Sequence, residues 1–223
     1  SNVLGVVNNI EKIIKKAHNL NIEVLIDAAQ SISHIPIDVN KIDCDYLVYS
    51  GHKIMGPTGV GVLYVKKNIQ KKIHPLLFGG QMIKEVKKIG FTYNDTPWKF
   101  EAGTPNIAQV IGLGSAINYF KKYDFIELHN HIETLYSYLI KQLNKIDNIT
   151  IYPNIITSPT PIISFNIKNV HGYDLTKLLG GFNICIRSGN HCAQPLINSF
   201  KENSLNRISL YYYNTIEEID FFI

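Results

Sequence analysis

Residues 48–65 read VYSGHKIMGPTGVGVLYV and point to the fold class of this chain. Apolar, β-rich residues open and close this stretch, and between them lies a loop of turn-forming residues that carries Lys53. A further β-rich run, VLIDAAQ at residues 24–30, contains Asp27, which lies 26 positions before Lys53. A helical pattern at residues 9–20 precedes that run, and helix followed by strand is typical of an α/β sheet. The sequence therefore predicts that strand ends present Asp27 and Lys53 at one sheet edge, where ligands of such sheets bind.

This pair of side chains suits one kind of cofactor. Pyridoxal phosphate (PLP) chemistry uses a lysine that forms a Schiff base and an aspartate that pairs with the pyridinium nitrogen. Taken singly, neither residue carries this meaning, because an aspartate at a strand end also forms turns or caps helices, and a lysine is commonly a solvated charge. The combination of Asp27 and Lys53 favours a PLP site, and a second motif strengthens that interpretation.

The second motif is ICIRSGNHCAQPL, in which an apolar run breaks into a polar loop. Cys192 lies in this loop beside His191 and five residues after Arg187. Positive charge stabilises a thiolate, so Cys192 is the predicted reactive thiol. The other two cysteines, Cys44 and Cys185, border or lie within apolar runs and are predicted to be small buried hydrophobic residues.

Composition excludes several classes of protein. The chain has 223 residues, of which 45% are hydrophobic and 18% charged, as expected for a globular protein with a sizeable core. The net charge is +4, but the lysines are scattered, so no nucleic-acid partner is predicted. No apolar stretch is long enough to span a bilayer, and three cysteines without a CxxC pair favour neither a disulfide framework nor a metal site. The chain starts and stops within patterned segments, which is expected of a fragment of a longer protein.

The order of the expected elements predicts two domains. Strands are expected at residues 24–26, 46–49 and 60–65. Residues 78–104 are rich in Gly, Thr, Asn and Pro and are expected to be irregular up to FEAGTPN, where Thr104 can either cap a helix or offer its hydroxyl to an anion. Later elements are expected as helices at 108–122 and 124–146, strands at 149–152 and 162–167, a helix at 173–179, strands at 183–187 and 207–213, and a helix at 215–222. They predict a large α/β domain over residues 1–113 and a small α+β domain over residues 114–223.

Taken together, the motifs resemble those of a known enzyme family. VLIDAAQ, SGHK, FEAGTPN, RSGNHCAQPL and NRISLYYYNT stand in the order found in SufS-like (group II) PLP-dependent cysteine desulfurases of the class V aminotransferase family. The resemblance starts at SNVLG and covers essentially the whole sequence. It implies the aspartate-aminotransferase-like fold, PLP fold type I. The chain would then form the later part of the large PLP-binding domain and most of the small domain, which carries the catalytic-cysteine loop.

The resemblance also implies roles for the motif residues. Lys53 would carry the cofactor and act as the base toward the substrate, and Asp27 would keep the pyridinium nitrogen protonated. Further cofactor contacts would be made to the ring-hydroxyl side by Gln30 and Asn2, to the phosphate by Ser50 and His52, and to the phosphate of a neighbouring subunit in a homodimer by Thr104.

The implied reaction converts L-cysteine into L-alanine. Arg207 would clamp the substrate carboxylate, a task that suits a bidentate guanidinium, with Arg187 and His191 as further substrate-binding residues. Cys192 would take the sulfur as a persulfide. A SufE-like or SufU-like acceptor would then receive it for iron–sulfur cluster assembly, in a bacterial cytoplasm or a plastid-type organelle.

Two departures and two alternatives accompany this interpretation. Asn190 stands where the family usually has a first histidine, and an amide cannot exchange protons as a histidine does. The family's N-terminal cofactor-binding part is not in the chain, so the chain alone is predicted to be inactive. The alternatives are a selenocysteine lyase of the same fold and a catalytically silent sulfur-carrier or dimerisation module.

Overall fold

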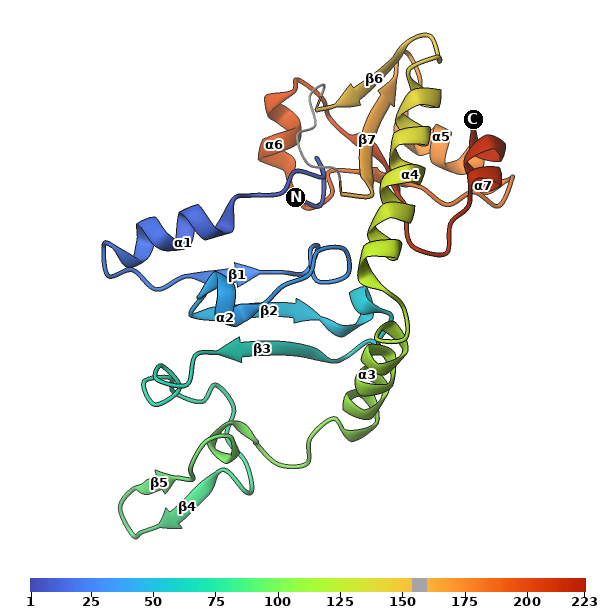
Figure 1. Cartoon of the computed structure of the whole chain (residues 1–223). Helices are drawn as coiled ribbons and strands as arrows, with labels where there is room; N and C mark the ends of the chain where they lie inside the picture. Colours follow the sequence, from blue (N-terminus) through green and yellow to red (C-terminus); the bar gives the residue numbers. More distant parts are fainter. Residues whose placement is uncertain (154–159) are drawn as a thin grey trace. The chain divides into compact units, whose positions relative to one another are not determined.

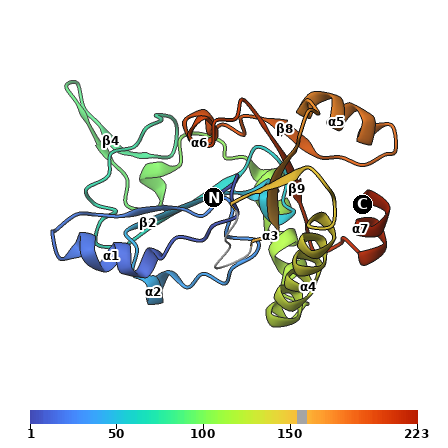
Figure 2. The same cartoon turned by 90° about the horizontal axis from the view of Figure 1, so that it is seen from above.

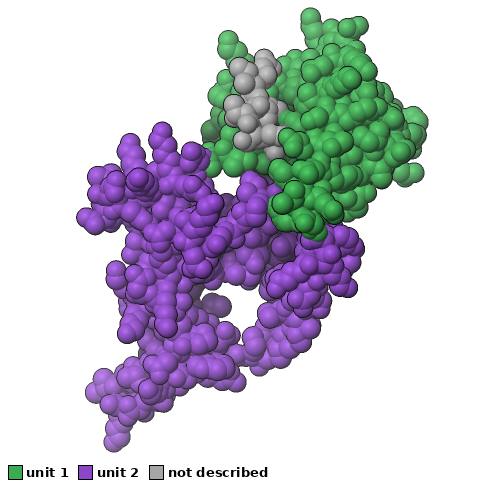
Figure 3. Space-filling view, in the orientation of Figure 1, with its two compact units in different colours: residues 1–8, 124–223 green, residues 9–123 purple. Residues whose placement is uncertain are grey.

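The computed structural model describes residues 1–153 and 160–223 (Figures 1 and 2). Its contacts divide the chain into two compact units, which Figure 3 shows in different colours. Unit 1 comprises residues 1–8 and 124–223, and unit 2 comprises residues 9–123. Among the described residues, no helix combines the length and the apolar character that a membrane crossing requires.

This division differs from the sequence-based one at both ends of unit 2. Helix α3 (Ile107–Phe120) spans the boundary expected after Leu113, and the Leu113 side chain is buried within unit 2. The first residues of the chain, 1–8, group with unit 1, where the Ser164 hydroxyl donates a hydrogen bond of 2.6 Å to the carbonyl of Val3. A contact between residues so distant along the chain leaves no local trace in the sequence.

Unit 2 is built on a three-stranded mixed sheet in the order β1-β2-β3. Strand β1 runs parallel to β2, and β2 runs antiparallel to β3. The elements of unit 2 are α1 (Ile10–His18), β1 (Leu25–Asp27), α2 (Val39–Ile42), β2 (Tyr46–Ser50), the 3-10 helix η1 (Gly51–Ile54), β3 (Gly61–Val65), β4 (Ile83–Val86), β5 (Phe91–Tyr93), the 3-10 helix η2 (Trp98–Phe100) and α3. The first expected helix and the three expected strands are confirmed to within two residues at each end.

The core of unit 2 lies between the sheet and its first two helices. Asn9 caps α1 by accepting a hydrogen bond of 3.0 Å from the Lys12 N–H, and it thereby satisfies one of the free amides of the first turn. Ile14 of α1 packs with Leu47 of β2 and with Cys44. Helices α1 and α2 lie side by side against the sheet (Figure 2). Cys44 is buried as expected, and this burial raises the pKa of its thiol.

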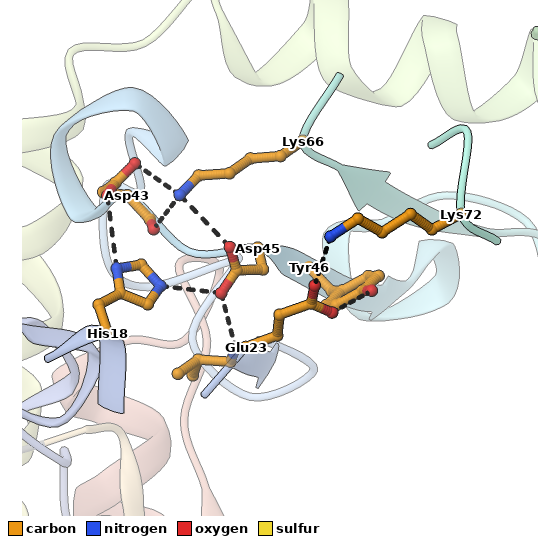
Figure 4. A network of polar contacts seen from close by, with 8 residues as sticks. His18, Glu23, Asp43, Asp45, Tyr46, Lys66 and Lys72 are labelled. Carbon is orange, nitrogen blue, oxygen red and sulfur yellow. Dashed lines mark hydrogen bonds and ion pairs between the residues drawn. The ribbon is translucent and has the colours of Figure 1, made fainter. Parts of the chain in front are cut away.

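A polar network holds the sheet at the amino ends of β1 and β2 (Figure 4). Its centre is Asp45, which is only 6% exposed and immediately precedes β2. One carboxylate oxygen of Asp45 accepts hydrogen bonds from the Val24 N–H at 2.7 Å and from His18 Nε2 at 2.8 Å. The other oxygen lies 3.4 Å from Lys66 Nζ, and Lys66 also contacts Asp43 at 2.7 Å. Buried polar groups are tolerated when they are paired in this way.

Residues 78–104 contain a hairpin that the sequence did not predict. Strands β4 and β5 pair antiparallel, and the Lys87 N–H donates a hydrogen bond of 3.0 Å to the Gly90 carbonyl in the turn between them. Three aromatic rings pack around the hairpin: the Phe78 and Phe91 centroids lie 6.3 Å apart, and those of Phe91 and Tyr93 lie 5.3 Å apart. Edge-to-face pairs of this kind stabilise a short hairpin.

Unit 1 contains a four-stranded antiparallel sheet in the order β6-β7-β9-β8. Its elements are α4 (Phe125–Leu143), β6 (Ile149–Tyr152), β7 (Ile162–Ile167), α5 (Gly172–Gly180), β8 (Arg187–Gly189), α6 (Gln194–Ser199), β9 (Leu205–Ser209) and α7 (Ile216–Phe222). Leu135, Leu139 and Leu143 lie on the buried face of α4 and pack with Phe165 of β7. Leucines four residues apart share one helix face, which accounts for this contact surface.

Three predictions in unit 1 are wrong. The strand expected at 207–213 is Leu205–Ser209 in the structure, so it starts earlier and ends four residues sooner. The strand expected at 183–187 begins only at Arg187, because Asn183 takes a left-handed conformation (φ 61°) and the Ile184 N–H is still bonded to Leu179 of α5. Cys185 therefore lies in an irregular segment and is exposed, not buried. The short helix α6 was also not predicted, since its six residues give too little periodicity.

Candidate active site

Four of the predicted cofactor residues gather at one edge of the unit 2 sheet. Strands β1 and β2 are parallel, with Asp27 opposite Val48, so both strands end at this edge. Asp27 is the last residue of β1 and Ser50 the last residue of β2. The helical turn η1 follows at once and carries His52 and Lys53. Carboxyl ends of parallel strands are the usual ligand-binding edge of an α/β sheet.

The Asp27 carboxylate is exposed and only partly engaged. Its Oδ1 accepts a hydrogen bond of 2.9 Å from the Ala29 N–H, which orients the side chain within the turn that leaves β1. Its second oxygen can therefore accept a hydrogen bond from a ligand. Gln30, a further predicted cofactor residue, follows in the same turn and is half-buried.

The loop that carries Lys53 is held so tightly that two positions require glycine. The Gly51 N–H donates to the Val60 carbonyl at 2.8 Å, and the Gly56 N–H donates to the Gly51 carbonyl at 2.9 Å. A Cβ atom on Gly51 would lie 2.9 Å from the Val60 side chain, and one on Gly56 would lie 2.8 Å from both the Gly51 carbonyl and Leu113. Lys53, which is half-buried, therefore extends from a rigid turn.

Thr104 lies in the exposed loop before α3 and does not cap that helix. The N-cap residue is Asn106, whose amide nitrogen donates a hydrogen bond of 2.7 Å to the Gly59 carbonyl. This bond links the Thr104 loop to the loop that follows Lys53. Capping, one of the two explanations for Thr104, is thus wrong, and its hydroxyl is exposed. Asn106 was not predicted to matter, because its side chain bonds a carbonyl 47 residues earlier and makes no capping bond to α3.

The side chains at this edge fit PLP by their chemistry. A carboxylate suits the ring nitrogen, a primary amine suits the aldehyde, and a hydroxyl with an imidazole suits the phosphate. Asp27, Lys53, Ser50 and His52 supply these groups from consecutive strand ends. Among the residues that the structure describes, no group of three or more His, Cys, Asp or Glu side chains could hold a metal ion.

A second group of predicted site residues lies in unit 1, around Cys192. The loop after β8 closes as a tight turn, because the Ala193 N–H donates a hydrogen bond of 2.7 Å to the Asn190 carbonyl. Both central residues are left-handed, His191 with φ 49° and Cys192 with φ 59°. Positive φ at both central positions defines a type I′ turn, which favours glycine or asparagine there. Cys192 is exposed at this turn, in a strained conformation that is common at functional sites.

Two arginines lie opposite each other beside this turn. Arg187 of β8 and Arg207 of β9 are direct cross-strand partners. Burial lowers the pKa of Arg207, and the like charge of Arg187 lowers it further. Its Nη1 donates to the Asn2 carbonyl at 3.0 Å, but its buried Nε has no partner among the described residues. Two guanidinium groups on paired strand positions, one with a buried donor that has no partner within residues 1–153 and 160–223, offer the charge and hydrogen bonds that an anion needs.

His191 does not serve as a charged neighbour of Cys192, contrary to the sequence-based expectation. Its side chain is only 2% exposed. This burial lowers the pKa of its imidazole, and the charges of Arg207 and Arg187 lower it further. The ring is therefore neutral near pH 7 and contributes no positive charge to the thiol. The sequence showed which residues were adjacent to Cys192 but could not show that this ring points inward.

Asn2 belongs to the same group as Cys192. Its side-chain amide nitrogen donates a hydrogen bond of 2.8 Å to the His191 carbonyl, and its backbone carbonyl accepts one of 3.0 Å from Arg207 Nη1. The structure thus brings together Asn2, Arg187, His191, Cys192 and Arg207 in unit 1. Another group, at the sheet edge of unit 2, contains Asp27, Gln30, Ser50, His52 and Lys53. Lys53 and Cys192, the two predicted catalytic residues, belong to different units.

Curated relatives resemble this chain along its whole length. It is 49% identical over 225 residues to a protein named cysteine desulfurase from Wigglesworthia glossinidia brevipalpis. It is also 41% identical over 220 residues to a probable cysteine desulfurase from Halalkalibacterium halodurans. These alignments include 100% and 99% of this chain but only 54% of each relative, so the chain spans about half the length of the curated relatives it matches.

Solved structures resemble the chain to a similar extent. The cysteine desulfurase CsdA from Escherichia coli superposes with a TM-score of 0.94 at 36% identity, over 99% of this chain and 54% of the other. A cysteine desulfurase from Thermococcus onnurineus NA1, solved in its apo form, gives a TM-score of 0.95 at 34% identity, over 100% of this chain and 56% of the other. These likenesses confirm the predicted fold class, PLP fold type I. Residues 1–222 match the aminotransferase class-V family, and the chain belongs to that family.

Proposed function

We propose that this chain supplies the reactive lysine and the reactive cysteine of a PLP-dependent cysteine desulfurase of the SufS-like type. The observation that carries the proposal is the strained turn that exposes Cys192 beside the facing pair Arg187 and Arg207. A nucleophile next to an anion site is what sulfur removal from an amino acid requires. The relatives named cysteine desulfurase support the same activity.

The unit 2 edge would bind and orient the cofactor. When bound, PLP supplies an electron sink that makes the substrate Cα proton acidic. The Asp27 oxygen that is not bonded to the Ala29 N–H would accept a hydrogen bond from the ring nitrogen, and the Lys53 amine would take the Cα proton as a general base. Further contacts to the cofactor would come from Ser50 and His52 at the phosphate and from Gln30 and Asn2 on the ring-hydroxyl side. Thr104 would reach the cofactor phosphate of a neighbouring subunit in a homodimer.

The unit 1 residues would bind the substrate and take its sulfur. Arg207, whose buried Nε has no partner in the described part of the chain, and Arg187 would hold the carboxylate of L-cysteine. The Cys192 thiolate would form a bond to the substrate sulfur as the bond between that sulfur and Cβ breaks. The electron pair of the broken bond leaves with Cβ, which is reduced to a methyl group when it takes up a proton. L-Alanine is released, and Cys192 is oxidised to a persulfide.

The sulfur acceptor and the assembly are further parts of the proposal. A SufE-like or SufU-like protein would remove the outer sulfur for iron–sulfur cluster assembly. A homodimer is supported by the apolar side chains that unit 2 leaves exposed around the β4–β5 hairpin, among them Leu76 at 92% and Ile89 at 94% exposure. Contiguous exposed apolar surface commonly marks an interaction site. Of the two predicted compartments, a bacterial cytoplasm and a plastid-type organelle, the bacterial relatives favour the first.

The decisive experiment compares the two exposed cysteines of unit 1. In the cofactor-loaded protein, Cys192→Ser should bind L-cysteine with a change in visible absorbance but release no alanine and form no persulfide. A serine hydroxyl is a poor nucleophile toward sulfur at neutral pH. Cys185→Ser is the matched control, because Cys185 is also exposed, and it should keep its activity.

Two results would count against the proposal. Normal alanine release by Cys192→Ser would show that the reaction needs no loop thiol. A parent protein that forms a persulfide on Cys192 but never shows the absorbance of a bound cofactor would favour the sulfur-carrier module. Comparing rates with L-cysteine and L-selenocysteine separates the desulfurase from a selenocysteine lyase.

A further inference from the structure

The turn that presents Cys192 cannot be maintained by its own residues. Its central residues, His191 and Cys192, are both left-handed, and neither is glycine, asparagine or aspartate, the residue types that a type I′ turn prefers. The one bond that closes the turn runs from the Ala193 N–H to the Asn190 carbonyl. A strained backbone persists only where its surroundings hold it, so further contacts must fix this turn.

The contacts that hold the turn converge on His191. Its Nε2 lies 2.8 Å from the carbonyl oxygen of Leu205 on β9. A carbonyl can only accept, so Nε2 carries the proton and donates it. The backbone carbonyl of His191 accepts a second bond, of 2.8 Å, from the Asn2 amide. Both bonds tie the turn to segments far away in the sequence.

The surroundings of the imidazole favour a fixed neutral donor over a proton-transfer group. The side chain is 2% exposed, and its Nδ1 has no hydrogen-bond partner among the residues that the structure describes. Its charged neighbours, Arg187 and Arg207, are both cations and disfavour a second proton on the ring. The single donated bond to Leu205 is therefore the polar contact that this ring contributes.

We propose that His191 is a positioning residue that holds Cys192 in its strained turn through the bond from Nε2 to the Leu205 carbonyl. The inference rests on the proposed function, because it assigns a purpose to the fixed position of the thiol. Because it is 2% exposed, His191 would touch neither substrate nor cofactor, contrary to the substrate-binding role that the resemblance implied. Its loss should therefore change how often Cys192 is in place to attack, and should leave substrate binding nearly unchanged.

Two substitutions at this position test the bond. His191→Leu fills similar space but cannot donate, whereas the side-chain amide of His191→Gln can still reach toward Leu205 as a donor. In His191→Leu, hydrogen exchange of the Ala193 amide should accelerate about tenfold, since one buried hydrogen bond is lost. In the cofactor-loaded protein, kcat for alanine release should fall by about the same factor, with KM for L-cysteine within about twofold. His191→Gln should restore most of the protection of the Ala193 amide and most of kcat.

The reference for these measurements is the Phe165 amide in the centre of the sheet, where β7 pairs with β9. Unchanged exchange at Ala193 in a folded His191→Leu protein would overturn the proposal, as would an unchanged kcat. If hydrogen exchange at the Phe165 amide also accelerates in His191→Leu, the test rests on His191→Gln. A folded His191→Gln protein whose kcat falls about tenfold would then overturn the proposed role of the bond. The exchange measurement needs neither cofactor nor substrate. Failure of the proposed function would thus appear separately, as a parent protein that releases no alanine.

Discussion

Replacing Asp45 by asparagine should destabilise unit 2 far more than the same change at its neighbour Asp43. Both carboxylates contact Lys66 and His18 in the network of Figure 4, and Asp43 has the shorter ion pair with Lys66, 2.7 Å against 3.4 Å. The difference lies in burial. The Asp45 side chain is 8% exposed and that of Asp43 is 62% exposed.

The expected magnitudes follow from this burial. Asparagine at position 45 can still accept from the Val24 N–H and from His18 through one oxygen, but its NH₂ group would face Lys66, and that charge-assisted bond would be lost. Hydrogen bonds to charged groups contribute about 1.5–3 kcal/mol each, so Asp45→Asn, which loses one of them, should lower the free energy of unfolding by about 1.5–3 kcal/mol. Exposed ion pairs contribute only about 0–1 kcal/mol, so Asp43→Asn should cost no more than that.

The effect of Asp45 should also depend on pH. Burial by itself would raise the pKa of this carboxyl, but the bonds from His18 and Val24 and the charge of Lys66 outweigh it and lower the pKa. A carboxyl whose pKa is depressed in the folded state stabilises the protein above its unfolded pKa. That stabilisation is lost as the pH falls through the folded pKa. The difference in stability between parent and Asp45→Asn should therefore shrink in acid.

Urea unfolding followed by tryptophan fluorescence measures these differences. The chain has a single tryptophan, Trp98, and it lies in unit 2 with the network. Equal losses of stability in Asp45→Asn and Asp43→Asn would refute the argument from burial. A difference between parent and Asp45→Asn that stays constant into acid would refute the argument from the pKa of Asp45.

Three further predictions concern other parts of the chain. Lys53→Ala should abolish the visible absorbance of bound cofactor with an unchanged far-UV circular dichroism spectrum, and label from borohydride reduction at any other lysine would contradict the assignment. Lys99 is 9% exposed and its Nζ donates to the Gln70 and Ile73 carbonyls at 2.9 Å each, so Lys99→Met should lower the stability of unit 2 by about 2–3 kcal/mol in the same urea assay. Leu139→Ala, at a side chain 1% exposed in the unit 1 core, should cost about 2–5 kcal/mol, measured by circular dichroism during thermal unfolding; a loss below about 1 kcal/mol would contradict this packing.

Features with local signals could be predicted from the sequence. Strands β6 and β7 match their expected bounds, because turn residues interrupt the apolar pattern around them. Asn9 caps α1, and an asparagine directly before a helical pattern is a local signal of this kind. The parallel pairing of β1 with β2 brings Asp27 and Lys53 to one edge for the same reason: each lies at the end of an apolar run.

Features that depend on distant contacts could not be predicted. The inward direction of His191 depends on a carbonyl of β9, 14 residues later, and on Asn2, 189 residues earlier. The exposure of Cys185 depends on how the chain leaves α5, which an apolar triplet does not reveal. The β4–β5 hairpin depends on ring contacts among residues up to 15 positions apart. In each case the deciding interaction joins segments whose separate patterns carry no sign of it.

The grouping of residues 1–8 with unit 1 makes that unit a discontinuous domain. Its buried interior includes Val3, which is 0% exposed and packs with Ile197 and Leu205. A recombinant piece that starts at residue 124 would therefore expose an apolar groove and leave the Ser164 hydroxyl without its acceptor. Dissection of this protein into autonomous halves calls for circular permutation or peptide complementation, in which the octapeptide SNVLGVVN is supplied to the C-terminal segment in trans.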